Sequence, residues 1–147
     1  MPEAKTRQAA ARDKRQGKSA STQAGEYVHE EIEHVRKGKH GAGSAKQAIA
    51  IGLSKARRAG VKAPVSKTAK KATKQKAAQD EKAVAGHRKK PASKRSHASK
   101  RVLKKEGHAA ASHASLSKQA TSSARKRTAA SRSAAAKKAA STRKHKA

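Results

Sequence analysis

The sequence contains no cysteine, phenylalanine or tryptophan, and it has a single tyrosine. Without cysteine, a disulfide framework, a thiolate zinc site and a cysteine nucleophile are excluded. One tyrosine cannot form the aromatic platform on which single-stranded bases stack, which argues against single-strand recognition folds. The longest apolar run, residues 48–53, is far shorter than the roughly 20 residues that span a bilayer. The N-terminus also lacks the apolar core of a secretory signal, so we expect a soluble, cytoplasmic protein.

Bulky apolar residues are scarce as well. Hydrophobic residues make up 33% of the 147 residues, but 35 of them are alanine and only 12 are Val, Ile or Leu. Little bulky surface combined with a net charge of +30 is typical of disordered chains, because burial cannot offset the loss of chain entropy. We therefore predict a mostly disordered chain with a small all-α element, and no enzymatic activity.

Acidic residues are few and unevenly placed: 9 Asp and Glu stand against 39 Lys and Arg. Residues 1–63 carry a net charge of +8, and residues 64–147 carry +22. This division predicts three segments. They are a basic N-terminal arm (1–20), with a helix pattern over 3–16, a helical hairpin (21–63), and a disordered cationic tail (64–147).

The first helix of the hairpin is predicted at about 22–37. Ala24, Val28, Ile32 and Val35 recur at helical spacing and form one apolar stripe after a Ser-Thr start. Glu31 falls inside this stripe, so we expect it at the rim or paired with a cation of the second helix. As a group, Glu26, Glu30, Glu31 and Glu33 are expected to lie along an exposed helix, where they solubilise it or act as a partner for the basic tail.

The second helix, at about 45–59, is better delimited. Ser44 and Gln47 fit a capping box, and Gly60 suits a left-handed C-terminal cap. Small residues dominate its stripe, which favours close approach of the first helix. Ile51 points away from the stripe; it is either a single exposed apolar residue or a contact in a weak homodimer.

The tail is of low complexity, with Lys and Arg clusters among Ala and Ser. Ala, Lys and Arg are good helix formers, so residues 67–85 and 116–140 are expected to become helical once their charge is neutralised. Free in solution, like-charge repulsion favours fluctuating helix at most.

A charge of this size points to a polyanion, and nucleic acid is the most abundant one. No zinc finger, zipper or homeodomain pattern is present, so binding is expected to be sequence-nonspecific and directed at the phosphate backbone of DNA rather than RNA. The residues predicted to contact nucleic acid are Arg57, Arg58, Lys70, Lys71, Arg88, Lys89, Lys90, Lys94, Arg95, Lys100, Arg101, Lys104, Lys105, Arg125, Lys126, Arg127, Lys137, Lys138, Arg143 and Lys144.

Two alternatives stay open: association with RNA or the ribosome, and a protein-interaction hairpin for which the tail is a generic polyanion anchor. No metal or cofactor is predicted. His29 with His34, and His108 with His113, are each five residues apart and do not match the one-turn spacing of a chelating pair. The glycine-rich stretch 38–44 is interpreted as an interhelical turn or a backbone-phosphate contact, since no strand precedes it and no lysine follows Gly43.

Residues 21–41 and 44–60 resemble a family of small basic bacterial proteins whose domain has no assigned function. The run KQAIAIGLSKARRAG, residues 46–60, is the most specific part, and the resemblance covers about residues 1–63. Separately, residues 64–147 resemble, in composition, the Lys/Ala-rich tails of linker-histone-like bacterial proteins. These resemblances imply a bacterial, nucleoid-associated protein that compacts DNA, and they supply no catalytic residues.

Overall fold

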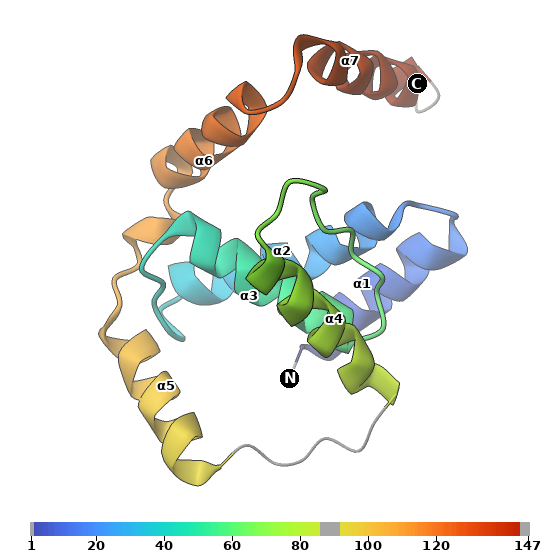
Figure 1. The fold of residues 1–147 in the computed structure, drawn as a ribbon. Coiled ribbons are helices and arrows are strands. Elements are labelled where there is room, and N and C mark those ends of the chain that lie inside the picture. The colour runs from blue at the N-terminus through green and yellow to red at the C-terminus, as the bar shows by residue number, and fades with distance from the viewer. Residues whose placement is uncertain (1, 86–91, 145–147) are drawn as a thin grey trace. The chain divides into compact units, whose positions relative to one another are not determined.

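The computed structural model describes residues 2–85 and 92–144, and within them the protein is all-α (Figure 1). Contacts divide the chain into two compact units, one up to Ser112 and one from His113 onward. The helices are α1 (Ala4–Arg15), α2 (Ala20–Arg36), α3 (Ala45–Arg58), α4 (Lys71–Ala85), α5 (Ser93–Lys105), a short 3₁₀ turn η1 (Ala109–Ala111), α6 (His113–Arg125) and α7 (Ala129–Lys144).

The prediction of a mostly disordered chain with a disordered tail is wrong. Residues 71–144 contain four of the seven helices of the described residues, and the stretch predicted as one helix at 116–140 is two, α6 and α7. Bulky side chains are few, but this fold is built largely on alanine. Of its thirteen buried hydrophobic residues ten are Ala, which allow helices to approach closely and have the highest helix propensity.

Local signals explain where the hairpin helices begin and end. Ser19 Oγ accepts a hydrogen bond from the Thr22 amide and starts α2, slightly before the predicted Ser21-Thr22 cap. Ser44 Oγ accepts one from the Gln47 amide and starts α3. Gly60 has φ +91°, and the following amide reaches back to the Ala56 carbonyl, which closes α3 as the sequence indicates.

Helices α2 and α3 pack face to face at a glycine. A Cβ placed on Gly52 would lie 2.6 Å from Val28 Cα, closer than two carbons can approach. Two alanine-rich clusters flank this contact. One gathers Tyr27 and residues of α1, α3 and the loop after α3, and the other joins Val35 to Ala48 and η1.

Acidic side chains are part of this interior. Glu31 is fully buried, and its Oε2 lies 2.5 Å from Lys55 Nζ of α3, which confirms the expected pairing with a second-helix cation. Glu30 is also buried and contacts Lys55. The expectation that the α2 glutamates are exposed solubilising groups is therefore wrong for Glu30 and Glu31. Buried charges persist only when paired, so these pairs help to fix the register of the hairpin.

Helix α4, expected to be disordered, packs on α3 through Asp80. Asp80 is 2% exposed and accepts hydrogen bonds from Ser54 Oγ (2.6 Å) and Arg58 Nε (2.8 Å), while Lys76 Nζ lies 3.5 Å away. Burial by itself raises the pKa of Asp80, but the hydrogen bonds from Ser54 and Arg58 outweigh it, so the pKa is lowered. One buried carboxylate thus links α4 to the hairpin.

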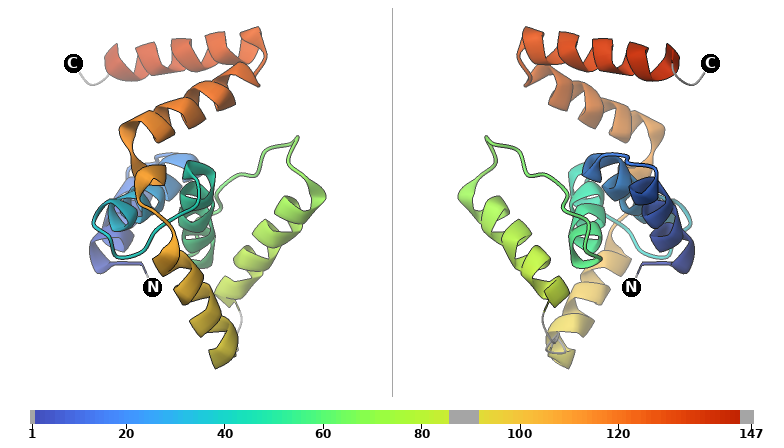
Figure 2. Two further views of the ribbon diagram at one scale, coloured as in Figure 1. Left: turned by 90° about the vertical axis from the view of Figure 1, so that its left-hand side faces the viewer. Right: turned by 90° about the vertical axis from the view of Figure 1, so that its right-hand side faces the viewer.

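The second unit is simpler. Figure 2 shows α6 and α7 as two straight helices joined by a short connection. Thr128 Oγ1 accepts a hydrogen bond from the Ser131 amide, which caps the start of α7. No residue of α6 is buried, and the described side chains of α7 are exposed. Among the described helices of the chain, none is long and apolar enough to cross a membrane.

Candidate nucleic-acid interface

The C-terminal part of the chain is a cationic surface without acidic side chains. Residues 107–147 hold ten Lys and Arg and no Asp or Glu. Alanine and serine separate these cations, and both residues are small, so the helical backbone of α6 and α7 stays close to solvent. The stretch therefore offers positive charge with no Asp or Glu of its own to oppose it.

The structure leaves most predicted contact residues exposed. These are Lys70, Lys71, Lys94, Arg95, Lys100, Arg101, Lys104, Lys105, Arg125, Lys126, Arg127, Lys137, Lys138, Arg143 and Lys144. Arg88, Lys89 and Lys90 lie outside the described residues. At 100° per residue, Lys94, Arg101 and Lys105 fall within 40° of one another on α5 and form one cationic face.

The two arginines at the end of the hairpin are placed differently from the prediction. Arg57 is 8% exposed, and its Nε donates a hydrogen bond to the Ala63 carbonyl, so it braces the chain after α3 rather than facing a partner. Arg58 keeps some exposure but is held by Asp80. The sequence alone therefore does not distinguish the basic residues that make contacts inside the fold, as Arg57 and Arg58 do, from those that face solvent.

The first unit contains all nine acids, and most of them neutralise local cations. Lys18 pairs with Asp13 at 2.7 Å, and Lys39 pairs with Glu3 at 2.8 Å. Hydrogen bonds from Lys39 and His34 lower the pKa of Glu3 to about 2. The basic charge of residues 1–106 is thus partly used inside the fold, whereas residues 107–147 contain no Asp or Glu.

The glycine-rich stretch between α2 and α3 is a packed connection. The Gly41 amide donates to the Leu103 carbonyl (2.8 Å), the Ala42 amide to the Gly107 carbonyl (3.1 Å), and the Gly43 amide to Gln47 Oε1 (3.1 Å). A Cβ on Gly41 would overlap the Glu106 backbone. Because these amides are already used, this loop does not offer the donors of an anion cradle.

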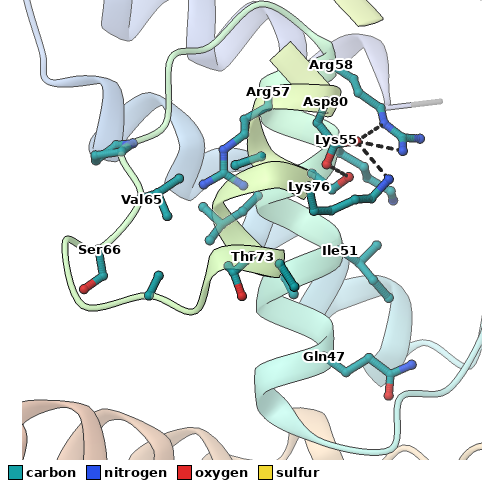
Figure 3. Close-up of a pocket in the computed structure, with 17 residues that line it drawn as sticks. Gln47, Ile51, Lys55, Arg57, Arg58, Val65, Ser66, Thr73, Lys76 and Asp80 are labelled. Atoms are coloured by element: carbon teal, nitrogen blue, oxygen red, sulfur yellow. Dashed lines mark hydrogen bonds and ion pairs between the residues drawn. The ribbon is translucent and has the colours of Figure 1, made fainter. Parts of the chain in front are cut away.

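A groove of about 810 Å³ runs between α3 and α4 and the loop that joins them. Figure 3 shows Ile51 and Val65 along it and Asp80 with its partners Arg58 and Lys76 at one end. Ile51, for which the sequence allows a single exposed residue or a dimer contact, is half-buried on this wall. Its contact in a homodimer stays a prediction.

One cluster is not apparent from the spacing of the histidines alone. Glu31, His34 and His40 each place a ligand atom within 4.8 Å of the others. The spacing of His29 and His34 does not reveal this cluster, because one of its ligands is the carboxylate of Glu31, which lies between these two histidines in the sequence. A signal is nevertheless present, since Glu31 and His34 are three residues apart on one helical face and Gly38 turns the chain back toward them.

Comparison with known proteins identifies the hairpin region. A domain described as a family of unknown function (DUF6496) spans residues 15–67, from the end of α1 to the loop after α3. Helices α4 to α7 lie beyond it. No curated protein and no solved structure matches the chain.

Proposed function

We propose that the protein binds duplex DNA without sequence preference through the exposed cations of α5, α6 and α7, and that it condenses DNA as a nucleoid-associated protein. The observation that carries the proposal is the ten-cation stretch after residue 106, which has no Asp or Glu and whose described Lys and Arg side chains are exposed. Such a surface attracts a polyanion, because no acidic side chain of the same stretch competes with phosphate.

The geometry of α7 suits the major groove. The groove is about 12 Å wide and admits one α-helix. The cations of α7 are spread around the helix rather than along one face: Arg132 and Arg143 share one side, Lys137 and Lys144 another, and Lys138 a third. A helix with this distribution contacts phosphates on both walls of the groove. It has no Asn or Gln that would read adenine, which favours nonspecific binding.

A salt-titrated anisotropy assay with a 30-base-pair duplex tests the proposal. In the full-length variant, Arg132, Lys137, Lys138, Arg143 and Lys144 are replaced by Gln, which keeps helix propensity. The slope of log K against log [salt] should become less steep by about 0.9 for each phosphate that the variant no longer neutralises, up to about 4.5.

The control variant removes the same charge from the first unit. Lys5, Arg15, Lys46, Lys62 and Lys82, all exposed, are replaced by Gln. It should change the slope by less than about 1. An equal change in both variants would mean that net charge alone matters, and the proposed interface would be wrong. Tighter binding to duplex RNA than to DNA above about 200 mM salt would favour the RNA alternative instead.

A further inference from the structure

We propose that Glu31, His34 and His40 form a binding site for one divalent transition-metal ion of the zinc class. The cluster lies on the last turns of α2 and in the connection to α3. It is separate from the cationic helices α6 and α7, and it does not depend on the proposed DNA binding.

Glu31 has a buried carboxylate oxygen without a hydrogen-bond partner. Glu31 is 0% exposed, and Lys55 occupies its Oε2. Its Oε1 has no hydrogen-bond partner, although His40 Nε2 lies 3.2 Å away. The ring nitrogen is therefore close to the carboxylate oxygen but not aligned to donate to it. A buried carboxylate oxygen without a partner is costly, and a cation that bridges the two atoms removes that cost.

The hydrogen bond of His40 determines its tautomer. Its Nδ1 lies 3.1 Å from the Gly41 carbonyl oxygen, which can only accept, so Nδ1 carries the proton in this contact. The neutral ring then presents its lone pair at Nε2, toward Glu31 Oε1. A backbone carbonyl on the second ring nitrogen is the usual outer partner of a metal-binding histidine.

His34 is oriented in a comparable way. Its Nε2 lies 2.9 Å from Glu3 Oε1, and Lys39 holds the same carboxylate. Glu30 Oε1, also buried and without a hydrogen bond, lies 3.9 Å from this nitrogen. The carboxylates of Glu3, Glu30 and Glu31 thus surround the two rings, with Lys39 and Lys55 as the facing cations, and leave the site attractive to positive charge.

The donor set decides the class of ion. Two imidazole nitrogens and one carboxylate oxygen suit Zn²⁺, whereas Mg²⁺ and Ca²⁺ prefer oxygen ligands alone. Three protein ligands leave a fourth position for water. An ion bound there would join α2 to the turn that follows this helix. The connection between α2 and α3 contacts Glu106 and Gly107 through Gly41 and Ala42, so the ion would also hold the connection in that position.

The test uses the metal-free full-length protein with ZnCl₂ in isothermal titration calorimetry, and with CoCl₂ in visible absorption. We expect one equivalent of Zn²⁺ to bind with a Kd below about 10 µM, and Co²⁺ to give the visible bands of a four- or five-coordinate site. The double variant His34→Gln/His40→Gln should weaken binding at least tenfold. The control His97→Gln/His113→Gln removes two exposed histidines of α5 and α6 and should leave it unchanged.

A second measurement covers the case in which the double variant fails to fold. In the wild-type protein, the ring resonances of His34 and His40 should shift on addition of one equivalent of Zn²⁺, and those of His97 and His113 should not. Absence of binding at 100 µM Zn²⁺, equal loss of affinity in both double variants, or ring shifts spread over all histidines would overturn the proposal.

Discussion

Replacing Gly52 by alanine tests the close packing on which the hairpin depends. The new Cβ would lie 2.6 Å from Val28 Cα and 3.0 Å from both Val28 N and Val28 Cγ2. Carbon atoms in contact prefer about 3.5–4.0 Å, so α2 and α3 must separate by about 1 Å. The obstacle is backbone, which a side-chain rotation cannot relieve.

Two opposing effects set the magnitude. Alanine gains up to about 1 kcal/mol over glycine inside a helix. Overpacking in a dense interior costs about 1–3 kcal/mol, and the contact with backbone favours the upper part of that range. We expect Gly52→Ala to lower the free energy of unfolding by about 1–2 kcal/mol.

Gly25 provides the matched control, because it lies in α2 and a Cβ there would meet nothing within 4 Å. Gly25→Ala should raise the free energy of unfolding by up to about 1 kcal/mol. Thermal unfolding of both full-length variants, followed by circular dichroism, should separate their Tm values by about 4–12 °C, at about 4 °C per kcal/mol. Equal stability of the two variants would refute the claim that Gly52 sets the distance between the helices.

Three further changes have defined outcomes. Asp80→Asn removes a buried charge that accepts hydrogen bonds from α3, so it should lower the free energy of unfolding by about 1–3 kcal/mol. The control Glu81→Gln changes the next residue of α4, which is exposed, and should change this free energy by no more than about 0.5 kcal/mol. Thermal unfolding measures both. The carboxyl resonance of Glu3 should titrate with a pKa of about 2 instead of 4.5. The stabilisation from its contacts with Lys39 and His34 is then complete above pH 4.5 and is lost as the pH falls through about 2. A midpoint near 4.5 would show that these contacts do not form in solution. Gly41→Ala should destabilise the connection between α2 and α3, because the new Cβ would overlap the Glu106 backbone. Gly107→Ala should not produce this steric conflict, because a Cβ there meets open space. Equal thermal stability of the two variants would contradict the packing of the connection.

The hairpin was largely predictable because its signals are local. The apolar stripe, Ser44 at the start of α3 and Gly60 at its end all act within a few residues, and the structure has α2 at 20–36 and α3 at 45–58 where the sequence indicates 22–37 and 45–59. The sequence also predicts that Glu31 pairs with a cation of the second helix, since a carboxylate inside an apolar stripe requires a partner, and the structure shows that this cation is Lys55.

The contacts of α4 and η1 were not predictable in this way. Asp80 and Arg58 are 22 residues apart, and nothing in the local sequence joins them. Ala110 and Ala111 look like ordinary tail alanines but are buried in the cluster around Val35. Composition predicts a disordered tail because alanine adds little bulk to a core, whereas here its small size is what lets helices approach closely.

In the candidate interface, too, some features could be predicted from the sequence and others depend on the fold. Exposure of the α7 cations follows from the lack of any apolar stripe, and the structure agrees with it. Arg57 stands in a basic run and is predicted as a phosphate contact for that reason, yet it donates to the Ala63 carbonyl inside the fold. Composition predicts the total charge, but the fold decides which cations remain available.

Lysine footprinting with and without DNA identifies the lysines that the duplex covers. The full-length protein is acetylated at limiting reagent, free and saturated with a 30-base-pair duplex, and protection is read by mass spectrometry. If α7 contacts the duplex, Lys137, Lys138 and Lys144 are strongly protected, and Lys5, Lys46 and Lys62 remain unchanged. Uniform protection, or protection of Lys5, Lys46 and Lys62 without protection of the α7 lysines, would show that α7 is not the DNA-binding surface.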